Sequence, residues 1–278
     1  MQLFYDIDPL RDYVFNLKNQ NRHVAFVPTM GALHKGHESL IKYAQNIADD
    51  VIVSIFLNPI QFAPNEDYQN YPRPLQEDIK RCQNLGISAL FLPTEQTIYP
   101  KNSLSTHVSV PDLSALYCGQ SRPHFFQGVT NVVIRLFNII QPNSAIFGEK
   151  DYQQLIIIKT CVNNLFLPIS IYGAPIIRNS QGLALSSRNH YLSKQATSEA
   201  SSIYKSLSMA KQAVLSGITN PTELDSLIQS HLAASITIDY IAYVDSNSLL
   251  PVDIVNPGNR ILFAGTLNQT RLIDNIAV

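Results

Sequence analysis

Cysteine is scarce in this sequence. Its three residues, Cys82, Cys118 and Cys161, lie far apart and form no C-x-x-C pair. Disulfide frameworks and cysteine zinc sites need paired or closely spaced thiols, so both are disfavoured. This cysteine usage is typical of a reducing compartment, and we expect a cytoplasmic location.

Long apolar runs and clusters of basic residues are also missing. No apolar run approaches the ~20 residues that span a bilayer. The N-terminal MQLFYDIDPLRDYV carries acidic residues early, unlike the apolar core of a signal peptide. Lys and Arg dominate no stretch, and the net charge is −1. Nucleic acids and anionic membranes bind basic stripes, so we expect neither as a partner.

Apolar residues make up 45% of the 278 residues, which is enough to form packed cores in about two domains. Short runs that are apolar almost throughout indicate strands buried on both faces of a sheet. These runs are 24–27, 51–57, 89–92, 144–147 and 169–172. Helical patterns between the runs, over 38–48 and 152–165, predict βαβ units and a parallel sheet.

The pattern changes after about Ile177. Helical segments at 198–215 and 221–234 precede short strands, which we expect at 239–244, 260–264 and 270–276. Asn220 before Pro221 provides an N-cap followed by proline at the first helical position. We therefore predict an α/β domain with a parallel sheet over 1–176 and a smaller α+β domain over 177–278.

The segment VPTMGALHKGHESL connects the first buried strand to a helix. In open α/β sheets, ligands bind where strands end and helix N-termini present N–H groups. His34 and His37 lie three residues apart at this helix start, and Gly31 and Gly36 allow close backbone approach. Imidazoles and amides can bind phosphate oxygens and stabilise the charge of a phosphoryl-transfer transition state. An isolated H-x-x-H pair is usually incidental, so the inference rests on the whole segment.

Six ordered motifs resemble those of the pantoate–β-alanine ligase family. They are PTMGALHKGH (28–37), SIFLNPIQF (54–62), YPR (71–73), FGEKDYQQL (147–155), LALSSRN (183–189) and TRLIDNIAV (270–278). The resemblance covers nearly the whole chain. It implies a Rossmann-like nucleotidyltransferase domain, a smaller C-terminal lid domain and a homodimer.

The resemblance also implies a reaction. ATP, (R)-pantoate and β-alanine would give pantothenate, AMP and pyrophosphate, with Mg²⁺ as the cofactor that accompanies ATP. The pantoate carboxylate would attack the α-phosphorus, and the β-alanine amine would then attack the pantoyl adenylate.

The site residues follow from the same motifs. The resemblance implies catalytic roles for His34, His37 and Lys150. It implies ATP binding by Met30, Gly31, Ala32, Leu33, His34, Lys35, Gly36 and His37, by Gly148, Glu149, Lys150 and Asp151, and by Ile177, Leu185, Ser186, Ser187 and Arg188. Pantoate would contact Gln61 and Gln154, and β-alanine would contact Gln61. The residue chemistry agrees: Lys150 is a mobile cation, Arg188 can grip two oxygens, and Gln61 both donates and accepts hydrogen bonds.

The stretch LYCGQSRPHFFQGV departs from the family pattern. Cys118 stands where a glutamate is usual, His124 where a small residue is usual, and Phe125 where a histidine is usual. No catalytic role is carried over to these three positions. We expect Cys118 to fill space as a small apolar side chain, because no base is evident near it.

The metal ligands are not assigned by the sequence. Glu66, Asp67 and Asp78 are acids near Tyr71-Pro72-Arg73, and none of them is singled out by its spacing. Two alternatives to the ligase stay open. One is a nucleotidylyltransferase of the same superfamily that acts on another small substrate. The other is a nucleotide-binding module that has lost catalysis.

Overall fold

The structure is a computed structural model that describes residues 1–64, 66–101 and 106–278. Backbone packing divides the chain into two compact units. The first comprises Met1–Glu149 and Ile157–Pro175, and the second comprises Lys150–Ile156 and Ile176–Val278. The segment Lys150–Ile156 therefore packs with the second unit. The functional domain boundary between residues 176 and 177 stays a prediction.

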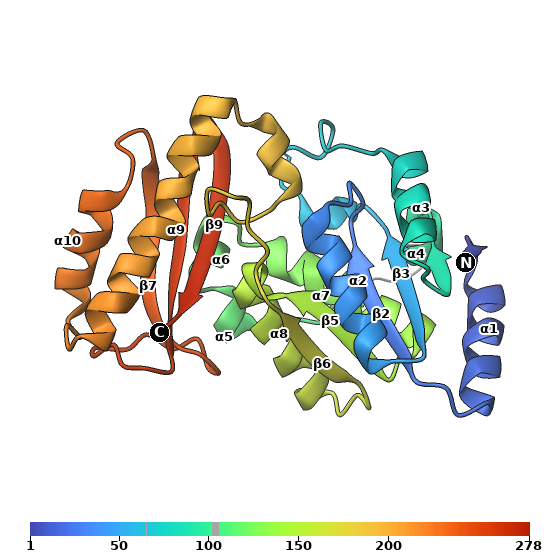
Figure 1. Cartoon of the computed structure of the whole chain (residues 1–278). Helices are drawn as coiled ribbons and strands as arrows, with labels where there is room; N and C mark the ends of the chain where they lie inside the picture. Colours follow the sequence, from blue (N-terminus) through green and yellow to red (C-terminus); the bar gives the residue numbers. More distant parts are fainter. Residues whose placement is uncertain (65, 102–105) are drawn as a thin grey trace. The chain divides into compact units, whose positions relative to one another are not determined.

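A six-stranded parallel sheet forms the centre of the first unit (Figure 1). Its strands are β1 (Gln2–Phe4), β2 (Val24–Thr29), β3 (Asp50–Ile55), β4 (Ala89–Phe91), β5 (Ser144–Gly148) and β6 (Ser170–Ala174). All five predicted strands are present, although β3 ends at Ile55 rather than at Leu57. The three-residue strand β1 was not predicted, because so short a segment has no readable period.

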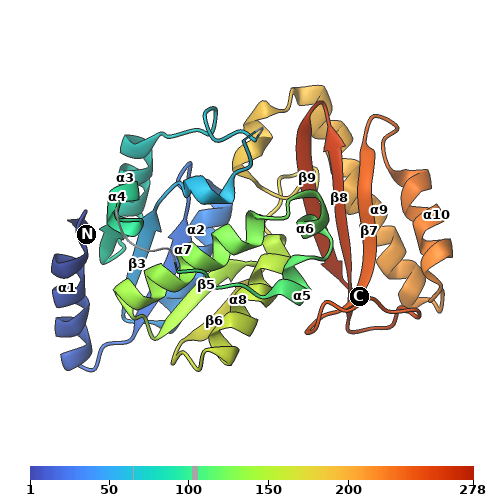
Figure 2. The ribbon, with the colours of Figure 1, turned by 180° about the vertical axis from the view of Figure 1, so that it is seen from behind.

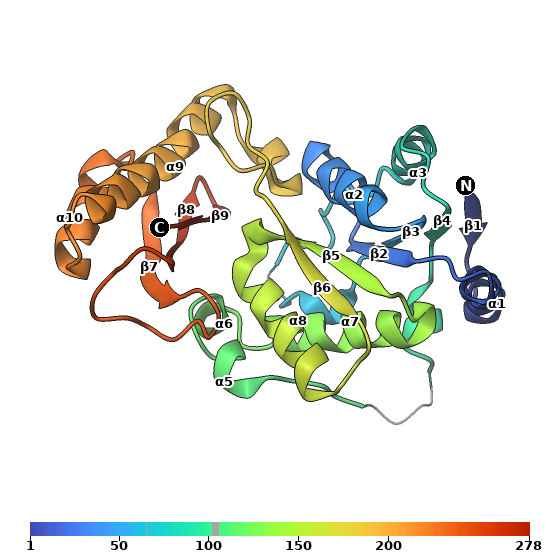
Figure 3. The ribbon, with the colours of Figure 1, turned by 60° about the horizontal axis from the view of Figure 1, so that its bottom comes forward.

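Helices cover both faces of this sheet. The longer ones are α1 (Ile7–Asn19), α2 (Lys35–Ile47), α3 (Leu75–Asn84), α7 (Phe125–Ile140) and α8 (Tyr152–Asn164), and the short ones are η1 (Pro59–Gln61), α4 (Glu95–Ile98), α5 (Pro111–Ser114), α6 (Cys118–Ser121) and η2 (Glu149–Asp151). Figure 3 shows α2 and α3 on one face and α7 on the other. Ile41 and Cys82 pack with Val27 on the first face. On the second face, the Phe137 ring contacts Phe26, at 6.3 Å between centroids.

The second unit contains a three-stranded antiparallel sheet in the order β7-β8-β9. Its elements are η3 (Ser187–Tyr191), α9 (Lys194–Leu215), α10 (Pro221–His231), β7 (Thr237–Asp245), β8 (Asn259–Leu267) and β9 (Thr270–Ala277). Figure 2 shows α9 and α10 together on one face of the sheet. Leu207 and Leu224 from these helices are fully buried in one cluster with Phe263. As predicted, Asn220 caps α10, accepting the Thr222 N–H at 2.8 Å. The predicted fold class is confirmed.

The three cysteines are all buried. Burial raises the pKa of Cys82 to about 12 and that of Cys161 to about 11. Both groups therefore stay protonated at neutral pH and are poor nucleophiles.

Within the described part of the chain, no helix is both long and apolar enough to cross a membrane.

Candidate active site

The sheet of the first unit has a topological switch point. In the order β4-β3-β2-β5-β6, the chain proceeds from β2 toward one edge of the sheet and from β5 toward the other. This is the doubly wound arrangement. Its ligands bind beside the strand ends at the point where the order reverses. The turn 30–34 follows β2, and Gly148 and Glu149 end or follow β5. Asn58 and Gln61 follow β3, the other neighbour of β2. The fold thus brings the ends of three predicted site segments to one edge of the sheet.

A buried carboxylate holds the turn after β2. Asp78, on α3, is only 2% exposed and accepts the N–H groups of Ala32 and Leu33 at 2.8 Å each. Gly31 has φ +84°, and a Cβ there would lie 3.0 Å from Ile55 and 3.2 Å from Asp78. Glycine is therefore required for both conformation and space. The amides of Ala32 and Leu33 bind Asp78, so the amides expected for phosphate must come from other residues of the segment.

His34 and His37 form a reciprocal cap at the start of α2. The His34 Nδ1 accepts the Gly36 N–H at 3.1 Å, and the His37 Nδ1 accepts the His34 N–H at 3.3 Å. The two rings lie 4.1 Å apart between centroids. A neutral imidazole that accepts through Nδ1 carries its hydrogen on Nε2. Both side chains are therefore set as Nε2–H donors at a helix N-terminus, where negative charge is favoured. Next to them, Met30 is partly buried and Lys35, the first residue of α2, is exposed.

Gln61 belongs to a buried hydrogen-bonded chain. The Tyr99 hydroxyl donates to Asn58 Oδ1 at 2.9 Å, and Asn58 Nδ2 lies 3.0 Å from the Gly128 carbonyl and 3.4 Å from Gln61 Oε1. Burial raises the pKa of Tyr99, so this hydroxyl remains a donor. Gly128 allows the close approach, because a Cβ there would lie 2.8 Å from the Gln61 Cα. The chain orients Gln61 so that its amide NH₂ is directed away from Asn58.

Because the motif resemblance implies that pantoate and β-alanine both contact Gln61, we expect Tyr99→Phe to weaken the use of these two substrates and not of ATP. The substitution keeps the ring and removes the hydroxyl that fixes Asn58 and, through it, Gln61. Loss of one hydrogen bond, about 0.5–1.5 kcal/mol, corresponds to roughly a 2- to 10-fold rise in KM for pantoate and for β-alanine. The KM for ATP should stay unchanged. Steady-state kinetics with each substrate varied checks this split, and an equal rise in the KM for ATP would contradict it.

An ion pair supports the backbone of the same segment. Arg122 binds Glu66 through two hydrogen bonds of 2.5 and 2.6 Å, and its Nη2 lies 3.5 Å from the Gln61 carbonyl. Its guanidinium stacks 3.7 Å from the centre of the Phe125 ring. Phe125, one of the departures from the family pattern, therefore packs against the arginine that braces Gln61. The Glu66 carboxylate accepts two hydrogen bonds from Arg122, and the Asp78 carboxylate accepts two from the backbone of the turn.

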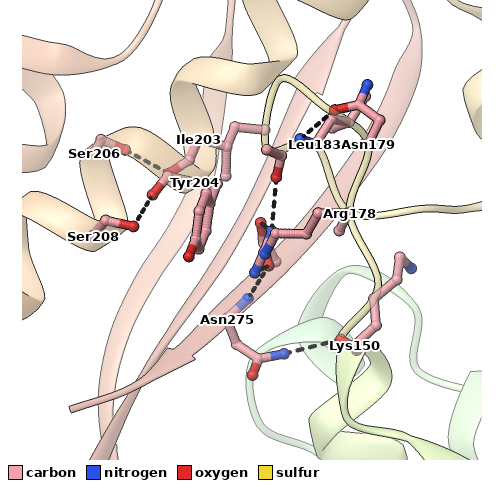
Figure 4. Close-up of polar contacts among 12 residues, drawn as sticks. Lys150, Arg178, Asn179, Leu183, Ile203, Tyr204, Ser206, Ser208 and Asn275 are labelled. Carbon is pink, nitrogen blue, oxygen red and sulfur yellow. Dashed lines mark hydrogen bonds and ion pairs between the residues drawn. The ribbon is translucent and has the colours of Figure 1, made fainter. Parts of the chain in front are cut away.

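The second unit carries the other predicted residues. Lys150 lies in η2, with its Nζ 3.8 Å from Asp151 and its side chain 20% exposed. Its carbonyl accepts Asn275 Nδ2 of β9 at 3.0 Å (Figure 4). Gln154 is partly buried in the first turn of α8, one helical turn after Lys150.

The segment Ile177–Leu185 is a tight hairpin. The Leu185 N–H donates to the Ile177 carbonyl at 2.9 Å, so two predicted ATP-binding residues pair directly. Ser186 then caps η3, accepting the Arg188 N–H at 3.3 Å. The Ser186 hydroxyl keeps its hydrogen for donation to another acceptor. Ser186, Ser187 and Arg188 are all partly exposed at this helix start.

Several supporting residues were missed from the sequence. Tyr99, Arg122, Asp274 and Asn275 gave no local signal, because their partners lie far away in the chain. Asp78 did give one: it is a charged residue on the apolar side of α3, four positions before the buried Cys82. In the described ranges, no group of three or more His, Cys, Asp or Glu side chains is placed to hold a metal ion.

The fold and this first-unit site define a doubly wound α/β protein of the nucleotide-binding class. The family model "Pantoate-beta-alanine ligase" matches residues 2–277. The pantothenate synthetase of Acinetobacter baylyi is 46% identical over 255 residues, which cover 92% of this chain and 90% of that protein. The pantothenate synthetase of Aquifex aeolicus is 43% identical over 276 residues, covering 98% and 97%.

Solved structures agree with the sequence relatives. Pantothenate synthetase from Thermus thermophilus has a TM-score of 0.94 and 38% identity, covering 100% of this chain and 99% of that one. Pantoate–β-alanine ligase from Francisella tularensis, solved with "Beta-gamma ATP" and β-alanine, has a TM-score of 0.82 and 38% identity, covering 100% and 97%. The chain belongs to the pantoate–β-alanine ligase family, and the predicted family and enzyme class are confirmed.

Proposed function

We propose that this chain condenses (R)-pantoate with β-alanine at the expense of ATP, through a pantoyl adenylate, with release of AMP and pyrophosphate. The observation that carries the proposal is the family match over residues 2–277, which includes every segment to which a role was assigned. A relative solved with an ATP ligand and β-alanine supports two of the three substrates.

In the first step a pantoate carboxylate oxygen forms a bond to the α-phosphorus, and the bond from that phosphorus to the pyrophosphate oxygen breaks. Negative charge grows on the phosphoryl oxygens and on the leaving pyrophosphate. The Nε2–H groups of His34 and His37, with the helix N-terminus behind them, suit the stabilisation of this charge. We assign the same task to the ammonium of Lys150 and to Ser186, Ser187 and Arg188.

In the second step the β-alanine amine forms a C–N bond to the acyl carbon, the bond from that carbon to AMP breaks, and the amine loses a proton. We assign pantoate to Gln61 and Gln154, and β-alanine to Gln61. Gln61 suits both because its amide NH₂ can donate while its carbonyl end is fixed by Asn58. The resemblance implies that the adenine is contacted largely through the backbone around Ile177.

Mg²⁺ is expected to arrive with ATP. It usually binds through substrate phosphates and one or two carboxylates, and it neutralises triphosphate charge. The carboxylates of Glu66 and Asp78 already accept two hydrogen bonds each from the protein. Their oxygens are therefore poor candidates, whereas the Asp151 side chain is 45% exposed and lies 3.8 Å from the Lys150 Nζ.

The test uses (R)-pantoate labelled with ¹⁸O in its carboxylate. An acyl adenylate transfers one carboxylate oxygen to the phosphate of AMP, so mass spectrometry should find one ¹⁸O in each AMP released. AMP release should require both acids, whereas pyrophosphate release in a single turnover should require only ATP and pantoate. Label in inorganic phosphate with formation of ADP would indicate an acyl phosphate instead.

The same assay separates the alternatives. Pyrophosphate release without any dependence on β-alanine in multiple turnovers would indicate a nucleotidylyltransferase. Nucleotide binding without turnover would indicate a module that has lost catalysis. Assembly as a homodimer, which the family resemblance implies, and a cytoplasmic location, which the cysteine usage favours, are further proposals. The mass measured by light scattering on the purified protein tests the former.

A further inference from the structure

The C-terminal motif TRLIDNIAV has no assigned task, although it contains all of β9. Adjacent residues of a strand point to opposite faces of its sheet. Asp274 and Asn275 are adjacent, polar and almost fully buried, at 4% and 2% exposure. Burying polar side chains costs free energy unless they form hydrogen bonds. The hydrogen-bond partners of Asp274 and Asn275 therefore indicate the structural task of each residue.

Asn275 holds the backbone of Lys150. Arg260 of β8 donates through Nη1 to Asn275 Oδ1, and Asn275 Nδ2 donates to the Lys150 carbonyl at 3.0 Å. An arginine only donates and a carbonyl only accepts, so the orientation of this amide is fixed by its partners. Arg260 is itself stacked 3.6 Å from the centre of the Tyr152 ring, two residues beyond Lys150. β8 and β9 thus contact the segment 150–152 at two points, the Lys150 carbonyl and the Tyr152 ring.

Asp274 holds the hairpin 177–185 from the other face of β9. Its two oxygens accept Nη1 and Nη2 of Arg178 at 2.5 and 2.8 Å. The same guanidinium donates to the Gly182 carbonyl at 3.1 Å and stacks 3.7 Å from the centre of the Tyr204 ring of α9. Figure 4 shows Arg178 beside Tyr204, and Asn275 directed at Lys150.

The hairpin in turn positions the start of η3. Asn179 Oδ1 accepts the N–H groups of Gln181 and Leu183 at 3.0 and 2.9 Å, which closes the turn. Asn189 Nδ2 donates to the Ala184 carbonyl at 3.0 Å, and the Asn189 N–H donates to the Ser186 carbonyl. A continuous series of contacts therefore joins Asp274 to the helix start that carries Ser186, Ser187 and Arg188.

We propose that Asp274 and Asn275 are positioning residues for ATP: Asn275 fixes Lys150, and Asp274, through Arg178, fixes the hairpin that presents Ser186–Arg188. This inference rests on the proposed function, because it assigns a task to groups expected to bind the phosphates. One strand thereby sets two phosphate-binding segments, which are separated in sequence, on one rigid sheet. Displacing such groups by about 1 Å can cost roughly 100-fold in rate.

Two single substitutions test the proposal. Asp274→Asn keeps the shape and loses the ion pair, whereas Asn275→Ala loses the donor to Lys150 without adding charge. We expect each to lower kcat/KM for ATP by about 10- to 100-fold, with KM for β-alanine unchanged. Tyr243→Phe is the matched control, because it removes an equally buried hydrogen bond of the same unit, to Asp225, that touches neither segment. It should leave the kinetics unchanged.

Amide hydrogen exchange of the ligand-free proteins tests the anchoring itself. Exchange should accelerate in peptides covering 177–189 for Asp274→Asn and in peptides covering 150–156 for Asn275→Ala, and in neither for Tyr243→Phe. Should one variant fail to fold, the other still decides, because each acts on its own segment. Kinetics equal to wild type in a folded variant, or a loss matched by Tyr243→Phe, would overturn the proposal.

Failure of the proposed function gives a different result. Wild-type protein without turnover ends the ligase assignment whatever the variants do. Binding of a non-hydrolysable ATP analogue, measured by calorimetry, then decides the present inference. Dissociation constants raised about 10-fold or more in both variants and unchanged in Tyr243→Phe support it, and constants equal to wild type contradict it.

Discussion

His34→Asn and His37→Asn should each slow pyrophosphate release from ATP and pantoate by about 10²–10³-fold, with the fold intact. This is the scale for removing one preorganised transition-state donor. Asparagine reproduces the Nδ1 acceptor of histidine, so it keeps the cap that each residue makes at the start of α2. It is too short to replace the Nε2–H donor. The variants therefore separate the capping role from the chemical one.

The measurement is single-turnover pyrophosphate release without β-alanine, together with urea unfolding. Stability should change by less than about 1 kcal/mol in His34→Asn, since His34 is the N-cap and asparagine is among the best residues at that position. His34→Gln provides the opposite control, because its longer amide reaches the Nε2 position but caps poorly. If His34→Asn retains the rate and His34→Gln loses it, the histidine is a structural cap and not a catalytic group.

The fold of the central sheet could be predicted because its strands carry their own signal. Val24–Val27 and Ser144–Phe147 are short runs that are apolar almost throughout, which is typical of strands buried on both faces. α7 could not be predicted the same way. Twelve of its 16 residues are buried, so no polar face marks its period. α1 had the signal, with Leu10, Val14 and Leu17 on one side, but was not recognised as a helix.

Some residues of the candidate site could likewise be predicted from the sequence, and others could not. Residues that face a ligand lie in short motifs at strand ends, and His34, Gln61 and Lys150 could be named from those motifs. Most of the residues that hold them could not, because their contacts span a long distance in the sequence. Asn275 lies 125 positions from Lys150, and Asp78 lies 46 positions from Ala32. No local pattern encodes such a pairing, so only the folded structure shows it.

Asp78→Asn should lower the rate of adenylate formation by about 10–100-fold while changing stability much less. The variant keeps the shape of the side chain, but its NH₂ group faces an N–H of Ala32 or Leu33 where an oxygen is needed, so the turn shifts. Burial raises the pKa of Asp78, and the hydrogen bonds from Leu33 and Ala32 offset only part of that rise. The ionised carboxylate is therefore costly to the fold. Replacing the carboxylate with an amide removes that cost. This gain offsets the effect of the lost hydrogen bonds on the free energy of unfolding, but it does not restore the rate.

The pH dependence distinguishes this account from a general structural effect. The folded pKa of Asp78 lies above its unfolded value, so the stability from this group is fully present below the unfolded pKa and is lost as pH rises through the folded one. On acidification through that window, wild type should gain stability relative to Asp78→Asn. Its advantage in kcat/KM should shrink at the same time, because protonation removes an acceptor from the turn. Parallel unfolding and rate measurements at a series of pH values, starting at about pH 4, where an ordinary aspartate titrates, and continuing upward, check the opposed trends. Stability and activity differences that fall together would show that Asp78 matters only for folding.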